Sequence, residues 1–271
     1  MYIDTAKIVK NKNLKIYKRI PKFLFRWLAC IIHQDEINDF LSKHGNEDPI
    51  PFAESTMDFF DAKLQVINEE NIPKTGRYIV VSNHPLGGLD GVGYISLMGK
   101  YRSDIKFPVN DLLMNLTPMH GVFIPINKHG KQNTNAIRDL NATFASDDLI
   151  LYFPAGLCSR KQKGKICDLE WKQTIISKAK EYERDIIPAY FDGKNSNRFY
   201  RIANIRKFLG IKFNIEMLLL PDEMFRQKEK ILSITFGKPI SYKTFTTEKT
   251  NKEWAAWLKE QTYALQLDKN N

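Results

Sequence analysis

Short, continuous apolar segments recur through the middle of the chain, and segments with helical spacing of apolar positions separate them. Continuous apolar segments such as residues 149–153 are typical of strands that are covered on both faces. The predicted strands span residues 78–81, 105–109, 122–126, 149–153 and 186–191. The predicted helices between them span residues 92–100, 111–116, 133–145 and 170–183. This alternation predicts βαβ units, and therefore an α/β fold with a mainly parallel central sheet flanked by helices.

The same pattern continues on both sides of this central part. Residues 57–68 predict a helix or a helix followed by a strand. Residues 213–220 and 231–236 predict two closing strands, and residues 248–265 predict a terminal helix. With 271 residues, the chain is long enough for one large α/β domain or two small ones.

An N-terminal segment, residues 1–46, differs in composition from the predicted domain, residues 47–271. It is rich in Lys and Arg, and residues 23–32 within it are apolar with a single cationic interruption. Pro21 is placed to open a helix and Gly45 to close one. The apolar part is too short to span a bilayer, so we expect an amphipathic segment that docks on an anionic membrane surface. The alternative is that its apolar side chains pack onto the rest of the protein.

Charge and cysteine content narrow the function classes. The chain carries 41 Lys and Arg against 31 Asp and Glu, a formal net charge of +10. This charge predicts an anionic partner: nucleic acid, an anionic membrane or a phosphate-bearing carrier. No nucleic-acid-binding motif, transmembrane stretch or signal peptide is recognisable. Three cysteines without a Cys-x-x-Cys pair suit a reducing compartment and argue against a structural zinc site.

The candidate chemistry lies just after the first predicted strand of the sheet, where His84 and Asp90 follow residues 78–81. Ligands of parallel sheets sit beyond the carboxyl ends of the strands. Histidine accepts a proton near neutral pH, and a carboxylate on its other ring nitrogen orients it. Gly87 and Gly88 let the backbone bend and approach a ligand. The alternative is an ordinary strand end with turn glycines.

The sequence Asn83-His84-Pro-Leu-Gly-Gly-Leu-Asp90 resembles the first motif of the glycerolipid (lysophospholipid) acyltransferase family, which includes the 1-acylglycerol-3-phosphate acyltransferase-like proteins. That motif is Asn-His, four residues and Asp. Here five residues separate His84 from Asp90, as in a bacterial subgroup similar to the ornithine- and glycine-lipid O-acyltransferases. The resemblance implies that His84 is the general base, that Asp90 orients it, and that Asn83, Gly87 and Gly88 serve substrate binding.

Residues 153–159, Phe-Pro-Ala-Gly-Leu-Cys-Ser, resemble the family's third motif, Phe-Pro-Glu-Gly-Thr-Arg-Ser. The matching residues, to which the resemblance assigns substrate binding, are Phe153, Pro154, Gly156 and Ser159. Ala155 and Cys158 replace the Glu and Arg that serve a glycerol-phosphate acceptor. Arg160, in a basic stretch, is a candidate substitute for the missing anion contact; the alternative is a solvated basic loop. Cys158 has no recognisable base, which argues against a nucleophilic role.

Two further motifs are partial. Gly121, Phe123 and Ile124 fall where the second motif would be, but the arginine that follows in the family is absent, and Lys128 and His129 receive no role. Pro188 matches the fourth motif, an apolar strand that lines the site. Residues 195–210 are basic and aromatic, which favours a helix facing the membrane or the acyl chain.

The resemblance therefore implies an O-acyltransferase of lipid biosynthesis, peripheral on the cytoplasmic face of the inner (cell) membrane. His84 would deprotonate the hydroxyl of a lyso-lipid, such as lyso-ornithine or lyso-glycine lipid. The expected donor is a thioester of acyl carrier protein or coenzyme A, with no metal, no cofactor and no nucleic-acid partner. The alternatives are a lysophosphatidate acyltransferase and a non-catalytic lipid-binding protein of the same fold.

Overall fold

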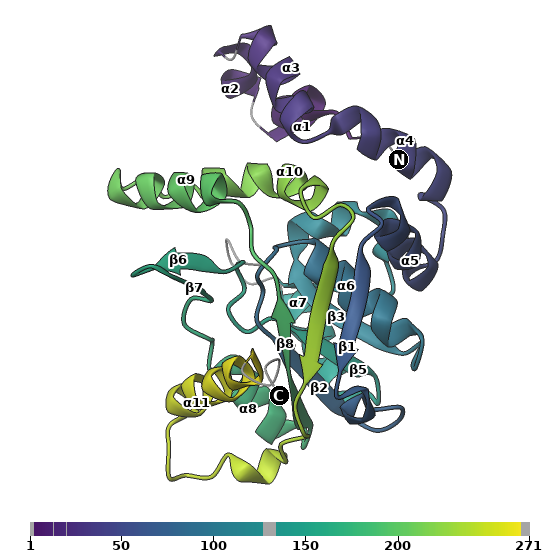
Figure 1. The fold of residues 1–271 in the computed structure, drawn as a ribbon, viewed down its shortest axis with the longest axis vertical. Coiled ribbons are helices and arrows are strands. Elements are labelled where there is room, and N and C mark those ends of the chain that lie inside the picture. Colours follow the sequence, from purple (N-terminus) through teal and green to yellow (C-terminus); the bar gives the residue numbers. More distant parts are fainter. Residues whose placement is uncertain (1–2, 13, 20, 127–133, 267–271) are drawn as a thin grey trace.

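A computed structural model describes residues 3–12, 14–19, 21–126 and 134–266. Its core is a seven-stranded sheet in the order β1-β9-β8-β2-β5-β3-β4 (Figure 1). The bounds are β1 Lys63–Ile67, β2 Tyr78–Ser82, β3 Ile105–Asn110, β4 Phe123–Ile126, β5 Leu149–Tyr152, β8 Asp185–Asp192 and β9 Ile231–Phe236. The five strands from β8 to β4 run parallel, whereas β9 is antiparallel to β8. The predicted mainly parallel sheet is confirmed.

Helices cover both faces of the sheet. On one face, α5 (Pro49–Phe59) and α6 (Leu89–Gly99) bury a cluster that includes Ile187, Ala189 and Phe191 of β8. On the other face, α7 (Thr134–Ala145), α8 (Thr174–Glu181) and α11 (Asn251–Ala264) bury a cluster that includes Ile186 of the same strand. Alternate β8 residues therefore face opposite layers, which is why its sequence is continuously apolar.

Helices α9 (Asn197–Phe208) and α10 (Leu220–Phe225) lie across one end of the sheet (Figure 1). Between them is a 3₁₀ helix, η4 (Ile215–Leu219), so the strand predicted for residues 213–220 is wrong. Glu216 and Leu219, three residues apart, face inward there. Periodicity in so short an apolar run does not distinguish a buried strand from a helical turn, and the tertiary contacts decide.

Two other predicted elements differ in detail. The helix predicted for residues 111–116 is a 3₁₀ helix, η2 (Asp111–Asn115). The basic stretch that contains Arg160, for which a solvated loop was the alternative, lies in a hairpin of β6 (Arg160–Gln162) and β7 (Lys165–Cys167). Smaller 3₁₀ turns are η1 (Glu69–Asn71), η3 (Thr117–Met119) and η5 (Tyr242–Thr244).

The N-terminal segment forms α1 (Thr5–Lys12), α2 (Leu14–Arg19), α3 (Lys22–Ile31) and α4 (Gln34–His44), set apart from the sheet (Figure 1). One helix from Pro21 to Gly45 was expected, but His33 adopts a left-handed conformation (φ 54°) and divides it. The His33 ring stacks on Phe225, with centroids 3.8 Å apart, and bonds Asp222 at 3.3 Å. The segment is thereby attached to α10. No helix within the described residues is long and apolar enough to cross a membrane.

Candidate active site

His84 and Asp90 meet just beyond the carboxyl end of β2. The Nδ1 of His84 lies 2.9 Å from Oδ2 of Asp90, which is fully buried at the start of α6. The same carboxylate accepts hydrogen bonds from the backbone N–H groups of Leu86, Gly87 and Gly91 at 2.9, 3.3 and 3.0 Å. Burial alone would raise the pKa of Asp90, but His84 and the N–H groups of Leu86 and Gly87 outweigh it and hold the pKa below its usual value.

An ionised Asp90 determines the tautomer of the imidazole. Because the carboxylate only accepts hydrogen bonds, Nδ1 of His84 must be the donor, which leaves Nε2 as the nitrogen that accepts a proton. The His84 side chain is 16% exposed, so the imidazole is not sealed in the core. The arrangement is that of a histidine general base with an orienting carboxylate.

The first and third motifs meet because β2 and β5 are neighbours in the sheet. Val81 of β2 pairs with Tyr152 of β5, so Phe153 emerges beside the residues that follow β2. The Phe153 ring stacks on the His84 ring, with centroids 4.1 Å apart and planes 21° apart. This contact covers one face of the imidazole, whereas the hydrogen bond to Asp90 is made at the ring edge. Together they restrict the orientation of the ring.

A third residue holds the backbone of His84. Asp168, just after β7, accepts from the His84 N–H at 3.2 Å, from Ser159 Oγ at 2.6 Å and from Trp171 Nε1 at 2.9 Å. The Ser159 N–H donates to the His84 carbonyl at 2.7 Å. Asp168 lies outside every motif, so sequence reasoning missed it; an isolated Asp three residues before a Trp is too weak a signal.

Helix α11 supports this network from the other side. The Asp168 N–H donates to Tyr263 Oη at 2.7 Å, and Lys259 Nζ donates to the Asp168 carbonyl at 2.7 Å. The terminal helix thus positions Asp168, which in turn positions the loop that carries His84.

Comparison with known proteins identifies the family. A sequence model of the family described as "Acyltransferase" matches residues 7–270. The chain belongs to this acyltransferase family. The predicted family and enzyme class, an O-acyltransferase of lipid biosynthesis, are confirmed by this match together with relatives named as O-acyltransferases.

Two such relatives cover nearly the whole acyltransferase. A lyso-glycine lipid O-acyltransferase of Bacteroides thetaiotaomicron is 50% identical over 264 residues, 97% of each chain. A lyso-glycine lipid O-acyltransferase of Phocaeicola vulgatus is 48% identical over 264 residues, 97% of this chain and 95% of the relative. The fold matches the 1-acyl-sn-glycerophosphate (LPA) acyltransferase PlsC of Thermotoga maritima with a TM-score of 0.52 at 14% identity, covering 92% of this chain and 94% of PlsC.

Asn83 and Ser159, expected at the substrate, form hydrogen bonds within the acyltransferase. The Asn83 amide donates to the Phe191 carbonyl at 2.8 Å and accepts from the Phe191 N–H at 2.7 Å, tying β2 to β8. Ser159 is buried and bonds Asp168. Substrate contact by Phe153, Pro154 and Gly156 stays a prediction; Phe153 and Gly156 are partly exposed, and Pro154 is buried.

Gly87 and Gly88, expected to let the backbone approach a ligand, lie against α10. A Cβ at Gly87, where φ is +81°, would lie 2.8 Å from Cδ2 of Leu220. A Cβ at Gly88 would lie 2.9 Å from Sδ of Met224. The close packing of α10 over the loop, with the left-handed backbone at Gly87, explains why neither position has a side chain.

Arg160, expected to contact a substrate anion, has partners within the protein, and its contact with substrate stays a prediction. Arg160 is buried, and its Nη2 lies 2.9 Å from Oε1 of Glu216, which Arg206 also contacts at 2.9 Å. Its Nη1 donates to the Cys158 carbonyl at 2.6 Å. A buried guanidinium already paired with a carboxylate offers little charge to a ligand. Burial also raises the pKa of the Cys158 thiol to about 11, which keeps it protonated.

Among the described residues, no group of three or more His, Cys, Asp or Glu side chains is arranged to hold a metal ion. Lys128 and His129, which received no role, lie outside the described residues.

Proposed function

We propose that this acyltransferase moves a fatty acyl group from a thioester donor to the hydroxyl of a lyso-lipid, with His84 as general base. The observation that carries the proposal is the His84–Asp90 pair beyond the end of β2, with Nε2 left to accept a proton. The acceptor we propose is a lyso-amino-acid lipid, lyso-glycine lipid first, because relatives named for that substrate are 48–50% identical over 97% of this chain.

The proposed reaction proceeds by direct attack of the acceptor. Nε2 of His84 takes the proton of the acceptor hydroxyl while the hydroxyl oxygen attacks the carbonyl carbon of the thioester. The tetrahedral intermediate collapses with cleavage of the carbon–sulfur bond, and the imidazolium returns the proton to the departing sulfur. The products are an ester and the free thiol of acyl carrier protein or coenzyme A. Asp90 stabilises the imidazolium during the step.

Two features argue against lysophosphatidate as the acceptor. Ala155 and Cys158 replace the polar residues of the family's third motif, and both are buried. Arg160, the nearest cation to that motif in the sequence, is neutralised by Glu216. These positions therefore lack the charge that a glycerol phosphate would need.

Thiol release by the purified protein tests this function. Acyl carrier protein and coenzyme A thioesters are offered with lyso-glycine lipid, lyso-ornithine lipid or lysophosphatidate. We expect release that depends on an amino-acid lipid. Equal or faster release with lysophosphatidate would contradict the proposed acceptor. No release with any acceptor, from protein that still binds liposomes, would favour a non-catalytic lipid-binding protein.

We further propose that the enzyme docks peripherally on the cytoplasmic face of an anionic membrane through two exposed apolar surfaces. One is the end of α9 and the turn after it, where Phe208 is 90% and Phe213 64% exposed. The other is α3, where Phe23 is 66% and Trp27 60% exposed. Ile31 at the end of α3 packs on the cluster that contains Phe199 of α9, so the two surfaces belong to the same end of the molecule.

Cations flank these apolar side chains. Lys207 and Lys212, both exposed, stand beside Phe208 and Phe213 in the chain. Exposed aromatic side chains bordered by lysines are typical of proteins that insert into the interface of an anionic bilayer.

The double variant Trp27→Ser/Phe208→Ser is expected to weaken binding to phosphatidylglycerol liposomes at least about tenfold, because two aromatic side chains no longer enter the bilayer. Co-sedimentation measures the partition. Ile137→Ser, which removes an exposed apolar side chain from α7, is the matched control and should bind as wild type does. Undiminished sedimentation of the double variant would exclude this docking surface.

A further inference from the structure

A buried side-chain hydrogen bond joins strand β2 to helix α6. Tyr94 lies on α6, one turn after Asp90, and its hydroxyl donates to Ser82 Oγ at 2.8 Å. Ser82 is the last residue of β2, two positions before His84. Tyr94 and Ser82 are each 1% exposed. The bond therefore links, inside the core, the helix that carries Asp90 to the strand that delivers His84.

The direction of this bond is set by its neighbours. Ser82 Oγ lies 2.9 Å from the carbonyl oxygen of Asn83 and 3.2 Å from its Oδ1, and it donates toward both. Because a hydroxyl has one proton, Ser82 Oγ has none left for Tyr94 and accepts from it. Burial raises the pKa of Tyr94, so its hydroxyl keeps the proton that it donates. The Tyr94 hydroxyl thus orients the hydroxyl of Ser82.

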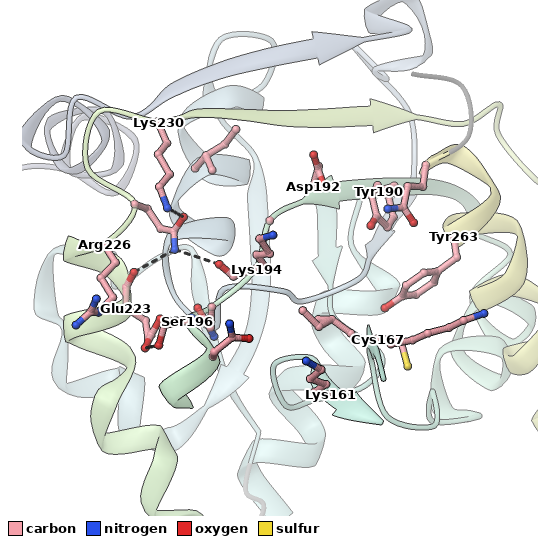
Figure 2. A pocket seen from close by; sticks show the side chains of 18 of the residues that line it. Lys161, Cys167, Tyr190, Asp192, Lys194, Ser196, Glu223, Arg226, Lys230 and Tyr263 are labelled. Carbon is pink, nitrogen blue, oxygen red and sulfur yellow. Dashed lines mark hydrogen bonds between the residues drawn. The ribbon is translucent and has the colours of Figure 1, made fainter. Parts of the chain in front are cut away.

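Ser82 in turn holds the peptide that precedes His84. The carbonyl of that peptide, which belongs to Asn83, accepts from Ser82 Oγ, and its N–H, which belongs to His84, donates to Asp168. Asp168 is held from another side, because its own N–H donates to Tyr263 Oη at the wall of a cavity of about 1280 Å³ (Figure 2). The plane of this peptide is therefore set at both ends, at the carbonyl from the core and at the N–H from the cavity wall.

The Tyr94 ring contacts a second support of His84. It lies edge-on to the Phe153 ring, with centroids 6.1 Å apart, and Phe153 stacks on the imidazole. The rings of Phe191 and Phe236 pack around Tyr94 with centroids 5.8 and 6.3 Å from its own. These contacts use the ring alone. Tyr94→Phe therefore keeps the packing and removes only the hydroxyl.

We propose that Tyr94 is a positioning residue for acyl transfer, acting through Ser82 on the backbone of His84; the inference rests on the proposed function. Because Tyr94 is buried, it acts without touching the substrate. Asp90 orients the imidazole at Nδ1, whereas the preceding peptide sets the position from which the ring extends. A peptide that turns would displace Nε2 from the acceptor hydroxyl, and a small displacement of a general base is costly.

Tyr94→Phe should lower kcat about tenfold and leave KM within about twofold, because proton removal depends on the placement of Nε2 and substrate binding does not. Thiol release with lyso-glycine lipid measures both constants. Tyr200→Phe is the matched control: it also removes a buried hydroxyl, one that accepts from the Asn195 N–H at 3.0 Å, and it should keep the wild-type kcat. A folded Tyr94→Phe protein with the wild-type kcat would overturn the proposal.

A double-mutant cycle tests whether Tyr94 acts through Ser82. Ser82→Ala should lower kcat by about the same factor, because the Asn83 carbonyl loses its donor. Adding Tyr94→Phe to Ser82→Ala should lower kcat no further, since the hydroxyl that Tyr94 orients is already gone. Losses that multiply, to about a hundredfold in the double variant, would overturn the route through Ser82.

Proton magnetic resonance gives a readout that is independent of turnover. An imidazole N–H that donates to a buried carboxylate resonates at low field, so the Nδ1 proton of His84, facing Asp90 at 2.9 Å, should give such a signal. His84→Ala, which lacks this signal, identifies it. Tyr94→Phe should shift or broaden the signal, and Tyr200→Phe should not. An unchanged signal in Tyr94→Phe would refute the positioning role.

The two assays separate this inference from the proposed function. A signal that Tyr94→Phe shifts, in a protein that releases no thiol with any acceptor, would refute the function and keep the positioning role. Thiol release that depends on His84 and is unaffected by Tyr94→Phe would keep the function and refute the positioning role.

Discussion

Replacing His84 with alanine is expected to lower kcat at least about 10²-fold, because the acceptor hydroxyl loses the base that removes its proton. No other described histidine pairs with a fully buried carboxylate, as His84 does with Asp90 at 2.9 Å. Thiol release at saturating acceptor and donor measures the effect. The loss should appear in kcat, since proton removal occurs in the transition state and not in binding.

His84 can be changed without dismantling the core, since its side chain is 16% exposed and its backbone bonds to Ser159 and Asp168 are kept. The His84→Ala protein should therefore unfold cooperatively near the wild-type temperature. His44→Ala, which removes a partly exposed histidine paired with Glu47, is the matched control and should keep the wild-type rate. A folded His84→Ala protein with near-normal kcat would contradict the general-base mechanism.

The second large effect is expected from Asp90→Asn, which preserves shape and removes the charge. An asparagine amide facing Nδ1 no longer requires that nitrogen to be the donor, so Nε2 loses its definite role as proton acceptor. Replacing the carboxylate of a His–Asp pair with an amide lowers kcat by up to about 10⁴-fold in serine proteases. We expect a loss of about 10²-fold or more here, measured as for His84. A rate within a few-fold of wild type would assign Asp90 a purely structural role.

The same variant tests the ionisation of Asp90 through stability. A carboxyl whose pKa is lower in the folded than in the unfolded state stabilises the protein above its unfolded pKa, ordinarily 3.8. That stabilisation is lost as the pH falls through the lower, folded pKa. The wild type should therefore exceed Asp90→Asn in free energy of unfolding at neutral pH, and the difference should shrink below about pH 4. A difference that is constant with pH would mean that Asp90 is not ionised.

The catalytic pair could be found from the sequence because it is local. Only five residues separate His84 from Asp90, and the loop between them carries the family's most specific motif. The role of Arg160 could not be found this way. Its partner Glu216 lies 56 residues away, in a segment that the pattern presents as a strand, so neither its burial nor its neutralisation is visible locally.

The sequence by itself determined the α/β class and the mainly parallel sheet, because continuous apolar strands separated by amphipathic helices bury both faces of a sheet in no other common way. It also determined where the strand ends would deliver His84. Only the tertiary structure decided what surrounds that residue: Phe153 on its ring and Asp168 on its backbone. These contacts join segments from different strands and loops. Strand order and register bring them together, and no local pattern of polar and apolar residues specifies either.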